Sequence, residues 1–78
     1  MRYIKTVLPM RDCQLFMEME SGSMVTVNLS PKLDTMKYAS LSDRDFFRTA
    51  KTDGNYVVWG GGRLRVTVNE LMEVALLG

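Results

Sequence analysis

The fold is decided by the stretch Asp53-Gly54-Asn55-Tyr56-Val57-Val58-Trp59-Gly60-Gly61-Gly62. It holds the only tryptophan of the chain, its densest run of β-forming residues and its most glycine-rich segment. β-branched and aromatic residues favour strands, whereas glycine clusters mark turns. We therefore expect a turn over residues 51–54 and then a strand over residues 55–59, in which Trp59 is buried as the anchor of a small core.

The glycine run is expected to turn the chain back into a second strand over residues 63–66. Leu64 and Val66 would face one side of that strand, and Arg63 and Arg65 the other, because side chains alternate along a strand. No Lys-Ser or Lys-Thr pair follows the glycines, and a strand rather than a helix comes next. The run is therefore a turn and not a phosphate cradle.

A capping box predicts the last element. Thr67 supplies a hydroxyl and Glu70, three residues later, supplies a carboxylate. This pattern indicates a helix over residues 68–77 that ends at Gly78. The side chains expected to face the core recur at helical spacing and are Leu71, Met72, Ala75 and Leu76.

The first part of the chain is typical of strands. Residues 3–8 are rich in β-forming side chains, and we expect this first strand to stop at Pro9 and to lie at a sheet edge, because proline cannot donate to a ladder. Residues 13–19 alternate next. One face would carry Cys13, Leu15, Met17 and Met19, and the other Gln14, Phe16 and Glu18.

Two loops are compatible with the hairpin that follows. A two-residue turn at Ser21-Gly22 would put the valines of the next strand on the same face as Phe16. A three-residue loop over residues 20–22 makes one face apolar and gives Gly22 the left-handed conformation that such loops need. We prefer the three-residue loop, which pairs Met19 with Ser23, Met17 with Val25 and Leu15 with Val27.

Two short helices are expected between the hairpins. Ser30 is the expected N-cap of a helix over residues 31–35, with Pro31 at its first position. Ser42 is the expected N-cap of a helix over residues 43–50. The loop between them would tuck Tyr38 and Leu41 inward, and the second helix would turn Phe46 and Phe47 to the core and Arg44 and Arg48 to water.

These elements predict a single domain over residues 1–78 of the α+β class. Its antiparallel sheet would consist of two β-hairpins plus an N-terminal strand, with one face covered by two or three short helices. The chain has no apolar run of the length that a membrane span needs, and its first residues do not resemble a signal peptide. We expect a cytoplasmic protein with no membrane partner.

Composition excludes most catalytic and metal chemistry. The chain has no histidine and a single cysteine, Cys13, so the commonest general base and zinc ligand, an intrachain disulfide and a cysteine-based metal site are all missing. Asp43, Asp45 and Asp53 are explained by helix and turn positions rather than by a carboxylate site. We expect no catalytic residues, no metal site and no cofactor, and Cys13 is expected to be a buried, inert thiol.

Two surface features are candidates for binding. Arg63 and Arg65, with Lys51 nearby, form the best candidate strip for an anion or an acidic partner. Its alternative is a solvated strand face that resists aggregation. Methionine is frequent, and Met10, Met24 and Met36 are expected to be exposed and to offer an adaptable protein-binding surface, with gap-filling in the core as the alternative.

The ordered succession of four motifs resembles the small bacterial family known as domain of unknown function 2442. The motifs are Glu20-Ser21-Gly22 before a strand, Asn28-Leu29-Ser30-Pro31-Lys32-Leu33 after it, Leu41-Ser42-Asp43 to Phe46-Phe47, and Thr52-Asp53-Gly54-Asn55-Tyr56-Val57-Val58-Trp59. The resemblance covers residues 4–72. The chain has Ser21 and Asn28 where the family usually has asparagine and aspartate, and after Trp59 it has glycines and arginines where the family tends to have Pro-Asn-Gly and an acidic residue.

The resemblance implies a bacterial binding or regulatory module, because some family members are fused to DNA-binding domains and others are encoded beside a second small protein. The first hypothesis is therefore a non-enzymatic protein-interaction module, antitoxin-like or an adaptor, that uses a strand edge, the exposed methionines or Phe16. Its partner would be another small protein, and a homodimer through the edge of the first strand is compatible with it. The second hypothesis is a small nucleic-acid binder that uses the basic strand face, although the net charge of +1 argues against nucleic acid.

Overall fold

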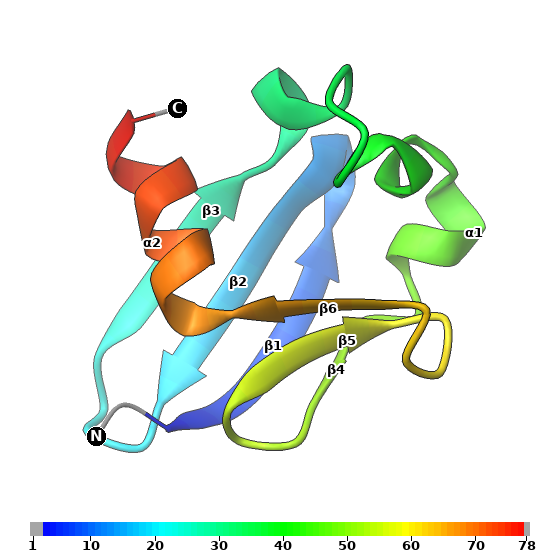
Figure 1. The fold of residues 1–78 in the computed structure, drawn as a ribbon. Helices are drawn as coiled ribbons and strands as arrows, with labels where there is room; N and C mark the ends of the chain where they lie inside the picture. Colours follow the sequence, from blue (N-terminus) through cyan, green and yellow to red (C-terminus); the bar gives the residue numbers. More distant parts are fainter. Residues whose placement is uncertain (1–2, 78) are drawn as a thin grey trace.

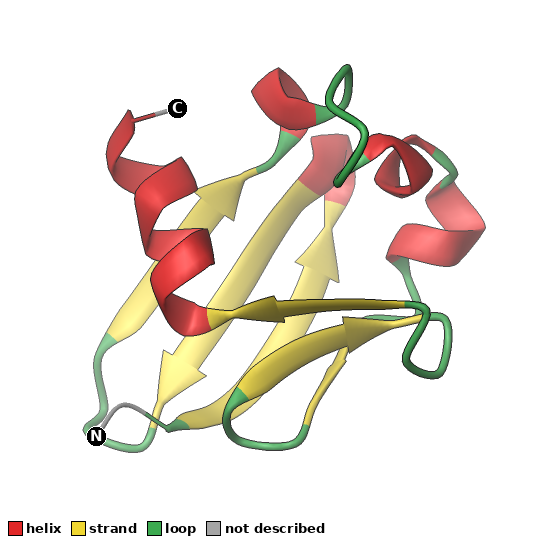
Figure 2. Ribbon diagram, viewed as in Figure 1, coloured by secondary structure: helices red, strands yellow, loops and turns green. Residues whose placement is uncertain are grey.

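The computed structural model describes residues 3–77 (Figure 1). Two three-stranded antiparallel sheets form its framework. The strands are β1 (Ile4–Met10), β2 (Gln14–Met19) and β3 (Met24–Asn28) in the first sheet, and β4 (Lys51–Thr52), β5 (Tyr56–Trp59) and β6 (Leu64–Thr67) in the second. The helices are the 3-10 helices η1 (Arg11–Cys13), η2 (Ser30–Lys32) and η3 (Ala39–Ser42) and the α-helices α1 (Arg44–Phe47) and α2 (Val68–Leu77) (Figure 2).

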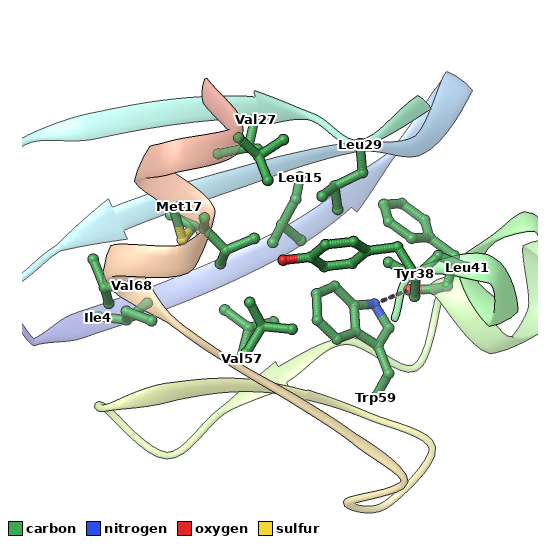
Figure 3. Packing of buried hydrophobic residues seen from close by; sticks show 14 of the residues in the cluster. Ile4, Leu15, Met17, Val27, Leu29, Tyr38, Leu41, Val57, Trp59 and Val68 are labelled. Carbon is green, nitrogen blue, oxygen red and sulfur yellow. Dashed lines mark hydrogen bonds between the residues drawn. The ribbon is translucent and has the colours of Figure 1, made fainter. Parts of the chain in front are cut away.

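The predicted α+β class is confirmed, whereas the single sheet covered on one face by helices is wrong. Residues 51–52, expected in a turn, form β4 and pair with β5. The second hairpin thereby acquires a third strand and becomes a sheet of its own. The two sheets meet where the N–H of Ile4 donates to the carbonyl of Gly54 at 2.8 Å. The buried side chains lie between the first sheet on one side and the second sheet and α2 on the other (Figures 1 and 3).

Trp59 anchors this core, as predicted. Its side chain is fully buried, and its indole Nε1 donates to the carbonyl of Phe47 at 3.1 Å. The Phe47 ring stacks on the indole with centroids 6.3 Å apart. Tyr38 and Leu41, which were expected to tuck inward, are both buried near the indole (Figure 3). The indole therefore ties the segment between the hairpins to the second sheet.

The glycine turn after Trp59 is shaped by a close contact. Gly60 has a φ of +61°, a left-handed conformation that favours glycine. A Cβ atom at this position would lie 2.3 Å from Cε1 of Phe46, far inside van der Waals contact. Gly61 is also left-handed, with a φ of +68°, but a Cβ there would meet nothing within 4 Å. Only the first glycine of the run is therefore required by packing as well as by backbone geometry.

The preferred three-residue loop of the β2–β3 hairpin is confirmed. Met17 lies opposite Val25 and Leu15 opposite Val27. The N–H of Met19 donates to the carbonyl of Ser23 at 2.8 Å, and Gly22 has a φ of +91°. The inward face of β2 is buried, as the alternation predicts.

The first strand does not stop at Pro9, because β1 continues to Met10 and Pro9 lies opposite Leu15. The backbone hydrogen bonds of β2 alternate between its two neighbours. The N–H and C=O groups of even-numbered residues point to β1, and those of odd-numbered residues point to β3. The nitrogen of Pro9 consequently points away from β2. Its missing N–H removes no ladder bond, which is the arrangement in which an edge strand tolerates proline.

The two helices expected between the hairpins are shorter than predicted. Residues 31–35 contain only the end of η2, and the side chain of Ser30 does not cap it but donates to Oδ1 of Asn28. Within residues 43–50 only α1 is α-helical. Its N-cap is Asp43 rather than Ser42, because Oδ1 of Asp43 accepts the N–H groups of Asp45 and Phe46. Arg44 and Arg48 are exposed and Phe47 is buried as expected, whereas Phe46 is half-buried against the core.

The capping box of α2 is confirmed. Thr67 Oγ1 accepts the N–H of Glu70 at 3.1 Å, and Oε1 of Glu70 accepts the N–H of Thr67 at 3.0 Å. Glu70 also pairs with Lys37 from the preceding loop. The expected core face is wrong at its end, because Ala75 is exposed and Leu76 is 83% exposed. Leu71 is buried and Met72 is half-buried against the core, as expected, whereas Val68 and Val74 are buried without having been predicted. Gly78 lies outside the described residues.

Candidate functional site

The outer side of the first sheet is the largest uncovered surface built by regular structure. We call it the outer face, and it comprises the side chains of β1–β3 that point away from the core. In cross-strand order they are Met10, Gln14 and Asn28, then Leu8, Phe16 and Thr26, then Thr6, Glu18 and Met24. The helices and the second sheet lie on the opposite, inner side (Figure 1). The outer face therefore has no covering element among residues 3–77.

Four of the nine outer-face side chains are apolar, namely Leu8, Met10, Phe16 and Met24. Leu8 is 54% exposed and Met24 is 65% exposed, Met10 is also exposed, and Phe16 is half-buried between Leu8 and Thr26. Glu18 is the only charged residue in these cross-strand rows, and Lys5 is exposed at the register shift of β1 next to Thr6. Exposed apolar side chains that gather on one face are typical of interaction sites. Met36, although 99% exposed, lies in the loop between η2 and η3 and not on this face.

The predicted basic strip is partly assembled by the second sheet. Lys51 lies opposite Val58, and Val58 lies opposite Arg65, so the two cations share one cross-strand row. The guanidinium of Arg65 lies 4.4 Å from the ring centroid of Tyr56, a cation–π contact. Arg63 precedes β6 and lies in the glycine turn. The row thus brings together Lys51 and Arg65 but leaves Arg63 outside the sheet.

The aspartates have structural roles, as expected. Asp43 caps α1. Asp53 Oδ1 accepts the N–H groups of Tyr56 at 2.9 Å and Asn55 at 3.0 Å. These bonds, led by the one from Tyr56 and helped by the nearby charge of Arg65, lower the pKa of Asp53. In the part of the chain that the structure describes, no group of three or more acidic, cysteine or histidine side chains is placed to hold a metal ion.

Cys13 lies in η1 rather than on the strand face where the alternation put it. It is half-buried with a φ of +57°, and its Sγ donates to the carbonyl of Leu41 at 3.6 Å. Burial, with the charge of Asp12, raises the pKa of the Cys13 thiol. Burial likewise raises the pKa of Tyr38, assisted by the charge of Glu73. Both groups are held in their neutral forms at pH 7, which suits packing and not nucleophilic attack.

A small pocket was not predicted from the sequence. It has a volume of about 280 Å³ and lies between the β2–β3 loop and α2. Its lining residues are Tyr3, Met19, Glu20, Ser21, Ser23, Val25 and Met72. The lining combines apolar side chains with one carboxylate and three hydroxyl-bearing residues, and it brings together no nucleophile activated by a base.

Leu8 is the member of the outer face that sequence analysis missed. The signal was the alternation of β1, since Val7 faces inward opposite Met17 and Leu8 must then face outward opposite Phe16. No helix in residues 3–77 is long and apolar enough to cross a membrane. No protein-family model, curated protein or solved structure matches the chain. The resemblance to domain of unknown function 2442 therefore stays a prediction.

Proposed function

We propose that the protein is a non-enzymatic interaction module that holds another small protein on its outer face. One observation carries this proposal: Leu8, Phe16, Met10 and Met24 form an uncovered apolar group on a rigid three-stranded sheet. Methionine side chains adapt to a partner's shape, and Leu8 and Phe16 lie side by side at the centre of the face. The expected partner presents an apolar helix or strand face with few charges, because the centre of the outer face is formed by Leu8, Phe16 and Thr26.

The resemblance to domain of unknown function 2442 supports an antitoxin-like or adaptor role in the bacterial cytoplasm. In that role the protein would bind a second small protein encoded beside it. The absence of histidine and the raised pKa of Cys13 are compatible with a function that needs no catalytic group. The structural roles of Asp43 and Asp53, which cap a helix and a turn, are also compatible with a function that needs no catalytic group.

The experiment is an affinity pull-down from native lysate with three tagged forms of the protein. The double variant Leu8→Ser/Met24→Ser removes apolar area from the outer face, and Met36→Ser removes a still more exposed methionine elsewhere. Because these side chains are exposed, the free energy of unfolding of each variant should lie within about 0.5 kcal/mol of that of the original protein. We expect a stoichiometric protein partner with the original protein and Met36→Ser, and its loss with Leu8→Ser/Met24→Ser. Retention of the partner by the double variant would contradict the proposal.

A second candidate function is binding of single-stranded nucleic acid to the outer side of the second sheet. The cation–π contact of Arg65 with Tyr56, in the same sheet as Lys51, favours it, because stacked aromatic rings and cations bind bases and phosphates. Its test is the fluorescence anisotropy of a labelled oligonucleotide at rising salt concentration. Binding that falls steeply with salt and is lost in Lys51→Glu/Arg65→Glu would support this function. Equal binding by that variant would exclude it.

A further inference from the structure

The edge of β3 is unpaired along its whole length. The hydrogen-bonded residue pairs between β2 and β3 are those with odd residue numbers. At the two ends of the strand pair, the N–H of Met19 donates to the carbonyl of Ser23 and the N–H of Leu29 donates to the carbonyl of Cys13. In an antiparallel pair, bonded and non-bonded positions alternate. The N–H and C=O groups of Met24, Thr26 and Asn28 therefore point away from β2. None of them has a backbone partner among residues 3–77.

The other sheet edges carry features that hinder strand pairing, whereas β3, which packs against α2, carries none of them in its own sequence. β1 carries Pro9 and an irregular register between Ile4 and Thr6, and it is joined to Gly54. β4 has two residues, one of them Lys51, and β6 carries Arg65. Proline, lysine, bulges and short length are the features by which proteins prevent strands from pairing at an edge. β3 has the sequence Met-Val-Thr-Val-Asn, with no charge, no proline and no register shift.

The β3 edge is also complementary to itself. Thr26 is the central residue of β3, so a two-fold axis through it would place Thr26 opposite Thr26 of a second copy and Met24 opposite Asn28 of that copy. All the outward N–H and C=O groups of the strand would then be bonded in one antiparallel register. No like charges would face each other, and threonine pairs are favourable across antiparallel strands.

We propose that two copies of this chain pair through β3, antiparallel and centred on Thr26, to form one continuous sheet from two first sheets. The dimer is isologous, because both copies use the same edge. The outer faces of the two copies lie on the same side of the continuous sheet, so the apolar surface with Leu8 and Phe16 is present twice on that side. The pairing uses backbone groups and does not rest on the proposed function. A contact built mainly on one strand pair is smaller than standard interfaces of about 1,600 Å². The dimer therefore dissociates on dilution.

The test is the molar mass measured by analytical ultracentrifugation from about 10 μM to about 1 mM, a range that brackets weak association. We expect the mass to rise from monomer to dimer. Thr26→Lys places like charges opposite each other across the axis and raises the dissociation constant about two- to fivefold. Thr26→Glu does the same, and an equimolar mixture of the two variants restores the dimer, because Lys then faces Glu. Thr6→Lys, an exposed change on β1 of the same outer face, leaves the dissociation constant unchanged.

Three results would overturn the proposal. The first is a monomer mass at every concentration. The second is a dimer that Thr26→Lys and Thr26→Glu leave intact. The third is a mixture of those variants that stays as monomeric as each variant alone. Circular dichroism of each variant at the lowest concentration shows that the monomer is folded, so loss of the dimer is separated from unfolding. Loss of a heterologous partner in Leu8→Ser/Met24→Ser is a separate readout and does not bear on the mass.

Discussion

Replacing Gly60 with alanine separates a backbone effect from a packing effect at one turn. The left-handed conformation costs an L-residue about 1–2 kcal/mol relative to glycine. The new Cβ of Gly60→Ala would also lie 2.3 Å from the Phe46 ring, which must shift although it packs against the core. Overpacking of this kind costs about 1–3 kcal/mol more. We expect Gly60→Ala to lower the free energy of unfolding by about 2–5 kcal/mol in total.

The chain supplies its own control for this prediction. Gly61 is left-handed like Gly60, but a Cβ there meets nothing within 4 Å. Gly61→Ala should therefore cost only the backbone contribution, about 1–2 kcal/mol. A double-mutant cycle completes the design, because in a Phe46→Ala background the ring is gone and Gly60→Ala should cost no more than Gly61→Ala.

Urea unfolding followed by the fluorescence of Trp59, the only tryptophan, measures the stability of all five proteins. The difference between Gly60→Ala and Gly61→Ala isolates the contact with Phe46. Equal losses of stability for the two glycine variants would refute the reasoning. So would a loss for Gly60→Ala that persists undiminished in the Phe46→Ala background.

Three further predictions concern other groups. Glu70→Ala removes the acceptor of the Thr67 N–H at the start of α2 and should lower the free energy of unfolding by about 1–2 kcal/mol, measured by urea unfolding; an unchanged midpoint would contradict the cap's role. Asp53 has a folded-state pKa below its unfolded value, so it stabilises the fold above about pH 4, and this stabilisation is lost as the pH falls through the lowered pKa. Thermal unfolding between pH 6 and pH 2 should therefore show a weaker acid dependence for Asp53→Asn than for the original protein, and parallel curves would rule this out. Cys13, whose pKa is raised, should react with a thiol reagent at pH 7 more slowly in the folded protein than in urea, and equal rates would show that the thiol is free.

Features with local causes were predicted correctly from the sequence. The β2–β3 register followed from the alternation of apolar residues and from Gly22, which a three-residue loop requires. The capping box followed from the spacing of Thr67 and Glu70, and both of its bonds form. The burial of Trp59 followed from its size and its place on a strand. In each case the deciding signal, an alternation, a spacing or a residue type, is read from a short stretch of the sequence.

Features that depend on distant parts of the chain were missed. Thr49 was expected inside a helix. Its Oγ1 instead accepts the N–H of Gly60 at 2.7 Å and donates to the carbonyl of Phe46. The segment after α1 is therefore held by a contact with the turn that follows β5. Pro9 was expected to end its strand, because the sequence does not reveal which way its nitrogen points. The division into two sheets depends on Ile4 meeting Gly54, far away in sequence.

The candidate binding surfaces were also predicted only in part from the sequence. The exposure of Met10, Met24 and Met36 was predicted and is confirmed. The common row of Lys51 and Arg65 needs β4, which the sequence did not predict. The outer face needs β1 beside β2, and this pairing alone brings Leu8 next to Phe16.

The shared core has a consequence for how the chain could be divided. The first sheet buries Leu15 and Val27 against Trp59 and the other side chains of the second half, so neither sheet has a second layer of its own (Figure 3). The loop around Met36 joins the two halves on the surface. A cut in that loop would yield two fragments that each expose one side of the core to water, and the unburied apolar surface disfavours folding of either fragment alone. Each fragment would fold only on the other, which makes this small protein suited to split-protein complementation.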